Sequence, residues 1–469
     1  MDHKGVFARK PVADIIASEG SAFRALPKVL GPFSIVAMGV GAIIGAGIFV
    51  LTGTAAALYA GPALTISFVL AAIACGLVGL CYAELSTLLP VQGSTYTYTY
   101  ATLGELAAWM IGWDLILEYS MGVGAVASGW SAYFNSLLVQ MGMGLPPELL
   151  SATAIADVPA AVIVLVITGL LIAGTRESVK LNNAMVVVKL VVVLAFVLVG
   201  AAYVNTANWQ PYIPLNTGEF GQFGISGVLR GASIVFFAYI GFDAVSNCAQ
   251  EARQPQRDMP IGILGSLALS TVLYIAVAAV LTGLVPYPKL NVADPVVMGA
   301  RAIGLPWLSL LVEVGALLGL TTVILVLLYG QSRIFATIAN DGLLPPVFAR
   351  IHPRFGTPWI SQLMIGVGVA IVAATVPIDT LSELVGAGTL FAFILVCVAV
   401  IYLRRAEPDT PRPFRTPWVP WLPLGGILAC LGLLAGLGAY TWVRLGLWMA
   451  VGLVIYFVYG RFQSRLRAG

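Results

Sequence analysis

The chain has 469 residues, of which 59% are hydrophobic and only 10% are charged, and its mean hydropathy is +0.95. Soluble domains average about 25% charged residues, so this composition excludes a soluble protein and indicates a chain that lies mostly in lipid. The net charge of +3 is small and its carriers are scattered. This excludes a nucleic-acid-binding face of clustered basic and aromatic residues.

Residues 1–31 are polar and of mixed charge, which is not the pattern of a cleavable signal peptide. We expect them to form a cytoplasmic N-terminal segment. The five cysteines of the chain lie in apolar surroundings without CxxC spacing, and there are only two histidines. We therefore expect no zinc site, no disulfide framework and no cofactor. Because no histidine cluster, paired catalytic acids or nucleophile with a base is present, we do not expect an enzyme.

Long apolar runs follow from residue 33 onward. A membrane-crossing helix needs about 20 mostly apolar residues, and the chain contains twelve such runs. In chain order they cover residues 33–59, 62–88, 103–129, 158–174, 182–204, 225–250, 260–285, 306–329, 358–377, 380–403, 422–441 and 444–460. We therefore predict an all-α membrane protein with twelve transmembrane helices.

The distribution of lysine and arginine predicts the orientation of these helices. With both termini on the cytoplasmic side, 19 of the 24 basic residues lie in cytoplasmic segments and four in outer segments. Retained positive charge marks the cytoplasmic side of a membrane protein. We expect a multi-pass protein of the plasma membrane with both termini in the cytoplasm. The remaining basic residue, Lys189, lies inside the fifth run.

The first run contains "GAIIGAGIFV" at residues 41–50, near the middle of the predicted helix. One interpretation is close helix packing, because small residues four positions apart let two backbones approach. The other is a break in the helix, since Gly45 and Gly47 each cost on the order of 1 kcal/mol relative to alanine in a helix. In lipid, an unwound backbone survives only where it lines a cavity or is buried in protein.

The sixth run contains a similar feature, because Gly241 and Asp243 interrupt apolar sequence. An intramembrane carboxylate is a functional candidate, with pairing to a neighbouring helix as the alternative. The first and sixth runs cross in opposite directions, so matching breaks indicate an inverted repeat with a binding site at its interface. A half-helix that starts near Ala46 presents free N–H groups and one that ends near Ile44 presents carbonyls. Together they suit a zwitterion such as an amino acid.

Five segments of the chain resemble the amino acid, polyamine and organocation superfamily, and within it the cationic amino acid transporter family and its bacterial proton-coupled relatives. The segments are "IIGAGIFVLTG" (43–53), "GELAAWMIGWDLILEY" (104–119), "FFAYIGFDAVSNCAQEARQPQRDMPIGI" (236–263), "SRIFATIANDGLLPPVFARIHPRFGTP" (332–358) and "RPFRTPWVPWLPL" (412–424). The resemblance implies a leucine-transporter-like fold in which helices 1 and 6 are discontinuous. It implies inverted repeats at 32–204 and 224–403, a cytoplasmic loop at 404–421, two extra helices at 422–460 and a cytoplasmic tail at 461–469.

The same resemblance implies a substrate site at the two breaks. The implied substrate-binding residues are Ile43, Gly45, Ala46, Gly47, Phe237, Tyr239 and Ile240. The substrate carboxylate would meet the amides of Ala46 and Gly47, and the amine would meet the carbonyls of Ile43, Phe237 and Ile240. Phe237 matches a position where relatives place an aromatic gate, whereas ordinary aromatic packing is the alternative for Tyr239.

Lys189 falls where certain proton-coupled relatives have a lysine in place of a sodium ion. Its ammonium would reach the carbonyls of Gly41 or Ile44 and the hydroxyl of Thr321 or Thr322. A lysine buried in an apolar environment can lose its proton at accessible pH. Binding and release of this proton would then be coupled to the conformational cycle. The alternative is that the long side chain extends to the cytoplasmic surface.

Acidic residues within the runs are further candidates. Asp114 and Glu118 lie one helical turn apart and share a face. Glu118 and Asp243 are candidates for a gate or a substrate pathway, and a polar pair bonded to neighbouring helices is the alternative for the two acids of the third run. Glu105, at the cytoplasmic mouth, matches a glutamate of the family. Arg230, at the outer end of the sixth run, is either a gate residue or an interfacial anchor.

Taken with the resemblance, these patterns predict a secondary active transporter that imports L-amino acids by proton symport with alternating access. The expected substrates are small neutral amino acids such as alanine, cationic ones such as arginine, or both. Exchange of amino acids or polyamines and coupling to sodium are the alternatives. The expected partners are the amino acid, the proton and membrane lipids, with other membrane helices left open and nucleic acid excluded.

Overall fold

The computed structural model describes residues 5–10, 30–90, 93–152, 155–174, 176–249 and 252–468. These residues form helices and connecting loops, and the β-structure among them is limited to two isolated bridges. The α-helices are α2 (Pro32–Ile43), α3 (Thr52–Ala55), α4 (Leu64–Leu88), α5 (Ser94–Thr102), α6 (Glu105–Gln140), α7 (Val158–Ala173), α8 (Arg176–Ala201), α9 (Gly224–Val235), α10 (Pro255–Leu284), α11 (Pro295–Ala302), α12 (Pro306–Asn340), α13 (Trp359–Thr375), α14 (Ile378–Ala406), α15 (Trp421–Ala435), α16 (Ala439–Ile455), α17 (Arg461–Gln463) and α18 (Arg465–Ala468). The prediction of an all-helical protein is confirmed.

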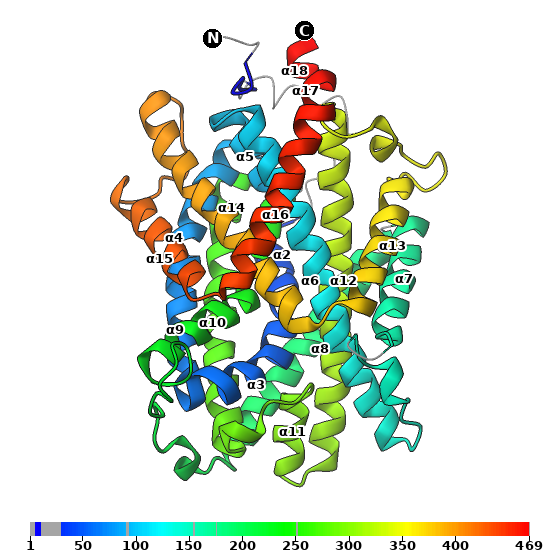
Figure 1. The fold of residues 1–469 in the computed structure, drawn as a ribbon, viewed down its shortest axis with the longest axis vertical. Helices are drawn as coiled ribbons and strands as arrows, with labels where there is room; N and C mark the ends of the chain where they lie inside the picture. Colours follow the sequence, from blue (N-terminus) through cyan, green and yellow to red (C-terminus); the bar gives the residue numbers. More distant parts are fainter. Residues whose placement is uncertain are drawn as a thin grey trace.

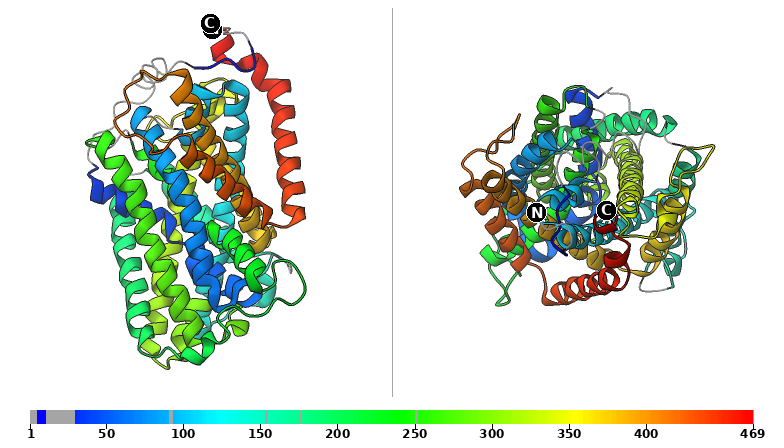
Figure 2. Two further views of the ribbon diagram at one scale, coloured as in Figure 1. Left: turned by 90° about the vertical axis from the view of Figure 1, so that its left-hand side faces the viewer. Right: turned by 90° about the horizontal axis from the view of Figure 1, so that it is seen from above.

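The long helices lie side by side along the long axis of the molecule, and residues 5–10 lie at the same end as α18 (Figure 1). Helices α15 and α16 lie on the outside of this assembly (Figure 2). Within the described residues, six helical segments are long and apolar enough to cross a membrane, and further apolar helices of 10–17 residues accompany them. Every predicted apolar run is occupied by helix, while the number of twelve crossings stays a prediction.

Several helix boundaries follow directly from the sequence. Prolines occupy the first turn of α2, α10, α11 and α12. An N–H group in the first turn has no acceptor within the helix, so proline loses no hydrogen bond there, and its fixed φ suits a helix. Helices α6 and α12 continue to Gln140 and Asn340, beyond the ends of their apolar runs. The apolar runs therefore underestimate the lengths of both helices.

Both predicted helix breaks are present. Helix α2 ends at Ile43, Ile44 is extended with φ −75° and ψ 100°, and a π-helical turn, η1 (Gly47–Leu51), resumes the helix. After α9, the 3₁₀ turn η6 (Phe236–Tyr239) ends at Ile240, which is extended with φ −62° and ψ 137°. Gly241 has a φ of +113°, and a second 3₁₀ segment, η7 (Asp243–Cys248), follows. Because this positive φ favours glycine, Gly241 marks the position of the second break.

The helices form two groups that differ in their packing partners. Helix α10 packs mainly against α4 and α2, and α9 packs against α4; we call α2, α4, α9 and α10, with their continuations η1, η6 and η7, the bundle body. Helix α6 packs mainly against α12 and α14, and α13 packs against α7 and α6; we call α6, α7, α12, α13 and α14 the scaffold body. Both breaks belong to the bundle body.

Candidate functional site

The two helix breaks touch one another, and glycine makes this approach possible. A Cβ atom added to Gly47 would lie 2.2 Å from the Cα of Ala238 in η6. A Cβ atom added to Gly241 would lie 3.0 Å from the backbone of Ala42 in α2. Side chains at these positions would separate the two interrupted helices, so the glycine pattern fixes the geometry of the crossing.

A small cavity lies beside the breaks, between the bundle body and the scaffold body. It is lined by Ala42, Ile43, Gly45, Ala46, Gly47, Glu118, Gly122, Val126, Phe237, Ile240, Val323 and Leu327. The residues of the two breaks form one wall, and residues of α6 and α12 form the other. Because the wall holds both the end of α2 and the start of η1, it offers a helix C-terminus and a helix N-terminus to the same space.

The structure places six of the seven predicted substrate-binding residues, together with Glu118, at this cavity. Those that line it are Ile43, Gly45, Ala46, Gly47, Glu118, Phe237 and Ile240. The sequence reasoning did not identify the opposite wall. There, Gly122 and Val126 follow Glu118 at four-residue intervals on α6, and Val323 and Leu327 share a face of α12. This four-residue spacing from an intramembrane acid places the three residues on one helix face, and it could have identified the wall from the sequence.

Two tyrosines lie behind the breaks. The hydroxyl of Tyr274 in α10 lies 2.8 Å from the carbonyl oxygen of Ile43 and 2.7 Å from that of Ala238. It has one proton, so it donates to one carbonyl at a time and links both breaks. The sequence reasoning missed Tyr274, although a hydroxyl in the middle of an apolar run was a signal. Tyr239 is not a lining residue; its hydroxyl donates to the carbonyl of Phe68, and its ring packs edge-on against Tyr274.

Lys189 in α8 is fully buried, and its ammonium lies at the end of α2. Its Nζ is 2.5 Å from the carbonyl oxygen of Gly41, 2.9 Å from that of Ile44 and 3.1 Å from Thr322 Oγ1. The C-terminal end of a helix favours a cation, so the ammonium stabilises the interrupted end of α2. The hydroxyl of Thr321 instead accepts from the indole of Trp130 and donates to the carbonyl of Leu317. A role for Lys189 in coupling stays a prediction.

The remaining acidic candidates occupy different environments. Glu118 lines the cavity and is 3% exposed. Asp114, one turn away, is buried, and neither of its carboxylate oxygens has a hydrogen-bond partner among the described residues. Asp243 accepts from the amide of Gly241 at 3.2 Å, so its carboxylate supports the second break. Arg230 pairs with Glu383 and thereby ties α9 to α14.

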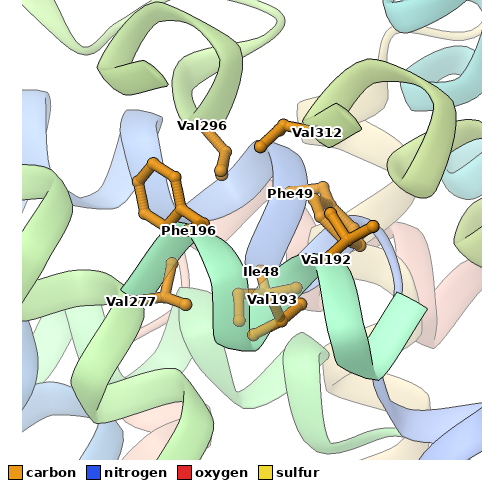
Figure 3. A pocket seen from close by; sticks show the side chains of 8 residues that line it. All are labelled: Ile48, Phe49, Val192, Val193, Phe196, Val277, Val296 and Val312. Carbon is orange, nitrogen blue, oxygen red and sulfur yellow. The ribbon is translucent and has the colours of Figure 1, made fainter. Parts of the chain in front are cut away.

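A second, smaller cavity lies on another side of η1 (Figure 3). It is lined by Ile48, Phe49, Val192, Val193, Phe196, Val277, Val296 and Val312. All of these side chains are apolar, so this cavity offers no partner for the charged groups of an amino acid. Among the described residues, no group of three or more His, Cys, Asp or Glu side chains is placed to hold a metal ion.

Two touching helix breaks, with a cavity and a buried lysine beside them, therefore lie inside a chain with helices that are long and apolar enough to cross a membrane. A sequence model of the family described as "Amino acid permease" matches residues 30–458. The chain belongs to this family, within the amino acid, polyamine and organocation superfamily. It is therefore a multi-pass membrane transporter and not an enzyme.

Individual relatives cover nearly the whole chain. It is 47% identical over 469 residues to "Branched-chain amino acid permease BcaP" of Bacillus subtilis (strain 168), covering 98% of this chain and 99% of the relative. It is 45% identical over 466 residues to "Methylthioribose transporter" of the same organism, with the same coverage of 98% and 99%. It is 38% identical over 424 residues to "Cationic amino acid transporter 9, chloroplastic" of Arabidopsis thaliana, covering 88% of this chain and 73% of the relative.

Proposed function

We propose that the protein is a secondary active transporter that imports L-amino acids across the plasma membrane by alternating access. The observation that carries this proposal is the cavity at the two touching breaks, whose wall holds the residues at which α2 ends and η1 begins. A helix N-terminus attracts the carboxylate of an amino acid, and helix C-terminal carbonyls attract its ammonium group. The backbone wall therefore fits the part that all amino acids share.

The opposite wall selects the side chain of the substrate. Val126, Val323 and Leu327 offer it an aliphatic surface, which favours neutral aliphatic amino acids, from alanine to the branched-chain ones. The 47% identity to a branched-chain amino acid permease supports the same class. Cationic amino acids are the second candidate, because Glu118 is the acidic residue in the cavity wall and would pair with a basic side chain.

We propose proton symport as the coupling mechanism. A protonated Lys189 holds the carbonyls of Gly41 and Ile44. Loss of its proton would remove the charge from these hydrogen bonds and weaken the attachment of α2 to α8. Protonation of Lys189 would then be linked to the position of α2, whose end lines the cavity.

The proposed topology has twelve transmembrane helices, with inverted repeats at 32–204 and 224–403 and both termini in the cytoplasm. In this topology the two interrupted helices are the first and sixth helices of the chain. Each is therefore the first helix of its proposed repeat. The excess of lysine and arginine in the segments assigned to the cytoplasm supports the orientation. In this orientation the end of the molecule that carries residues 5–10 and α18 faces the cytoplasm.

Uptake of labelled amino acids, with methylthioribose as a comparison compound, by proteoliposomes tests this proposal. Alanine, valine, leucine, arginine and methylthioribose would be compared with an imposed proton gradient, with a sodium gradient and with neither. We expect uptake of neutral aliphatic amino acids that requires the proton gradient in the wild type and loses this requirement in Lys189→Ala. Uptake of Lys189→Ala that still responds to the gradient would remove Lys189 from the mechanism. Uptake only against a preloaded amino acid would identify an exchanger, and uptake driven by sodium would identify a sodium symporter.

A further inference from the structure

Helix α5 lies where the bundle body meets the scaffold body, at the end of the molecule that carries residues 5–10 and α18 (Figure 1). All nine of its residues, Ser94–Thr102, are buried, although eight of them carry a hydroxyl group. A helix that is polar on every side gains little from burial itself. Four of its hydroxyl groups, those of Ser94, Thr95, Tyr96 and Tyr100, bond to side chains outside α5, and these partners divide into two sets.

The first set anchors α5 to the scaffold body through carboxylates. Tyr100 donates to Glu105 Oε2 at 3.0 Å, and Tyr96 donates to Asp341 Oδ2 at 2.8 Å. Glu105 begins α6, and Asp341 directly follows α12. Helix α5 also packs mainly against α6 and α14 of the same body.

The two chain termini strengthen this anchor. Arg467 pairs with Glu105 at 2.9 Å, and Ser464 and Tyr456 also donate to this carboxylate. From the N-terminal segment, Lys10 pairs with Asp341 at 3.0 Å. Tyr96 and Tyr100 therefore each donate to a carboxylate that also pairs with a cation from one terminus.

The second set joins α5 to the bundle body through neutral groups. Thr95 Oγ1 lies 2.6 Å from the hydroxyl of Tyr82 in α4, and Ser246 in η7 donates to Ser94 Oγ at 2.9 Å. Hydrogen bonds with a charged partner are roughly twice as strong as neutral ones. The neutral hydrogen bonds between α5 and the bundle body are therefore weaker than the charged ones between α5 and the scaffold body. They are the bonds that would break if the two bodies separate.

We propose that α5 is a cytoplasmic gate that stays with the scaffold body, and that the hydrogen bonds Tyr82–Thr95 and Ser94–Ser246 break when the cavity opens to the cytoplasm. The proposal rests on the proposed transport function. The substrate leaves between α5 on one side and α4 and η7 on the other. The hydroxyl groups of α5 then face water, which explains why a buried helix is polar. The two termini hold α5 in place during this movement.

A reversible cross-link across the proposed seam tests this assignment. The variant carries Ser94→Cys and Ser246→Cys in a background from which the native cysteines have been removed. The matched control keeps Cys397 and adds Gly426→Cys, which joins α14 to its packing neighbour α15 and does not involve α5 or η7. The Cβ of that cysteine would lie 3.0 Å from Cys397 Sγ, close enough for a disulfide. Amino acid uptake is measured in proteoliposomes before oxidation, after oxidation and after reduction.

We expect oxidation of the seam pair to reduce net uptake at least tenfold and reduction to restore it, with uptake by the control pair unchanged. Uptake that continues through a fully formed seam cross-link would show that α5 moves with the bundle body and would overturn the proposal. Equal arrest of the control pair would do the same, because the arrest would then not depend on the seam. A reduced seam variant and a wild type that both take up no amino acid would contradict the transport function instead.

Discussion

Thr321 and Thr322 are neighbours in sequence, yet only Thr322 lies against Lys189. Replacing Thr322 by valine removes a hydrogen bond to a charged group, which contributes about 1.5–3 kcal/mol. We expect proton-driven uptake by Thr322→Val to fall by roughly tenfold or more. Thr321→Val loses a neutral hydrogen bond and should change uptake by no more than about fivefold. Initial rates of uptake under a fixed proton gradient would measure both.

The two threonines form a matched pair, since the substitution, the helix and the depth are the same. If both valine variants lost the same amount of proton-driven uptake, the contact between Thr322 and Lys189 would not contribute to coupling. The two variants should have similar melting temperatures, so that a difference in uptake is not a difference in folding.

At the residue level, the sequence indicated the polar groups at the breaks but not their partners. Gly45, Gly47 and Gly241 were visible as poor helix formers in apolar runs, and Lys189 as a charge inside one. Tyr274 was missed because a tyrosine in an apolar run is also an ordinary packing residue. The choice between Thr321 and Thr322 depends on the rotation of α12 relative to α8, and neither helix sequence alone fixes this rotation.

At the level of helices, the contact between the two breaks depends on a missing side chain at Gly47. We expect Gly47→Ala to abolish transport and to lower the melting temperature, because the added Cβ would lie 2.2 Å from the backbone of Ala238. Overpacking of this kind costs about 1–3 kcal/mol or more. Gly76→Ala is the control, since a Cβ there would meet no atom within 4 Å. Gly76→Ala should preserve transport and raise stability by up to about 1 kcal/mol.

The C-terminal tail supplies a second prediction at this level. Arg467→Ala leaves the buried Glu105 without the cation that lies 2.9 Å away. Because Arg467 itself is partly exposed, we expect a loss of about 1–3 kcal/mol of stability, seen as a lower melting temperature in detergent. Arg461→Ala, at an exposed position of the same tail, should change stability by less than about 0.5 kcal/mol. Equal melting temperatures for the two variants would show that the ion pair does not stabilise the tail.

The apolar runs predicted where helices form because burial in lipid requires both apolar side chains and internal backbone hydrogen bonding. They could not predict α5, whose hydroxyl-rich sequence resembles an exposed loop. Its burial depends in part on Asp341, which follows a helix distant in the sequence and accepts from Tyr96. For the same reason, the aliphatic wall of the cavity became visible only once α6 and α12 were placed opposite the breaks.

At the level of the whole molecule, the orientation in the membrane can be measured directly. We would introduce Lys289→Cys or Arg405→Cys, both at exposed positions, into a background without native cysteines. A membrane-impermeant maleimide should label the cysteine at 289 on intact cells and the one at 405 only after permeabilisation, because the basic segments around Arg405 are retained in the cytoplasm. The opposite labelling pattern would invert the topology, and labelling of both positions on intact cells would contradict the number of crossings between them.

The cavity wall is shared between two bodies that pack mainly within themselves, and this affects how the protein responds to heat. An amino acid that fits contacts both bodies at once and so joins them in the folded state. Ligand at one hundred times its dissociation constant adds about 2.7 kcal/mol of stability. We expect the melting temperature of the purified protein to rise with valine or leucine and to remain unchanged with amino acids that the aliphatic wall rejects. Thermal stability in detergent then ranks candidate substrates without a membrane, a gradient or a radioactive label.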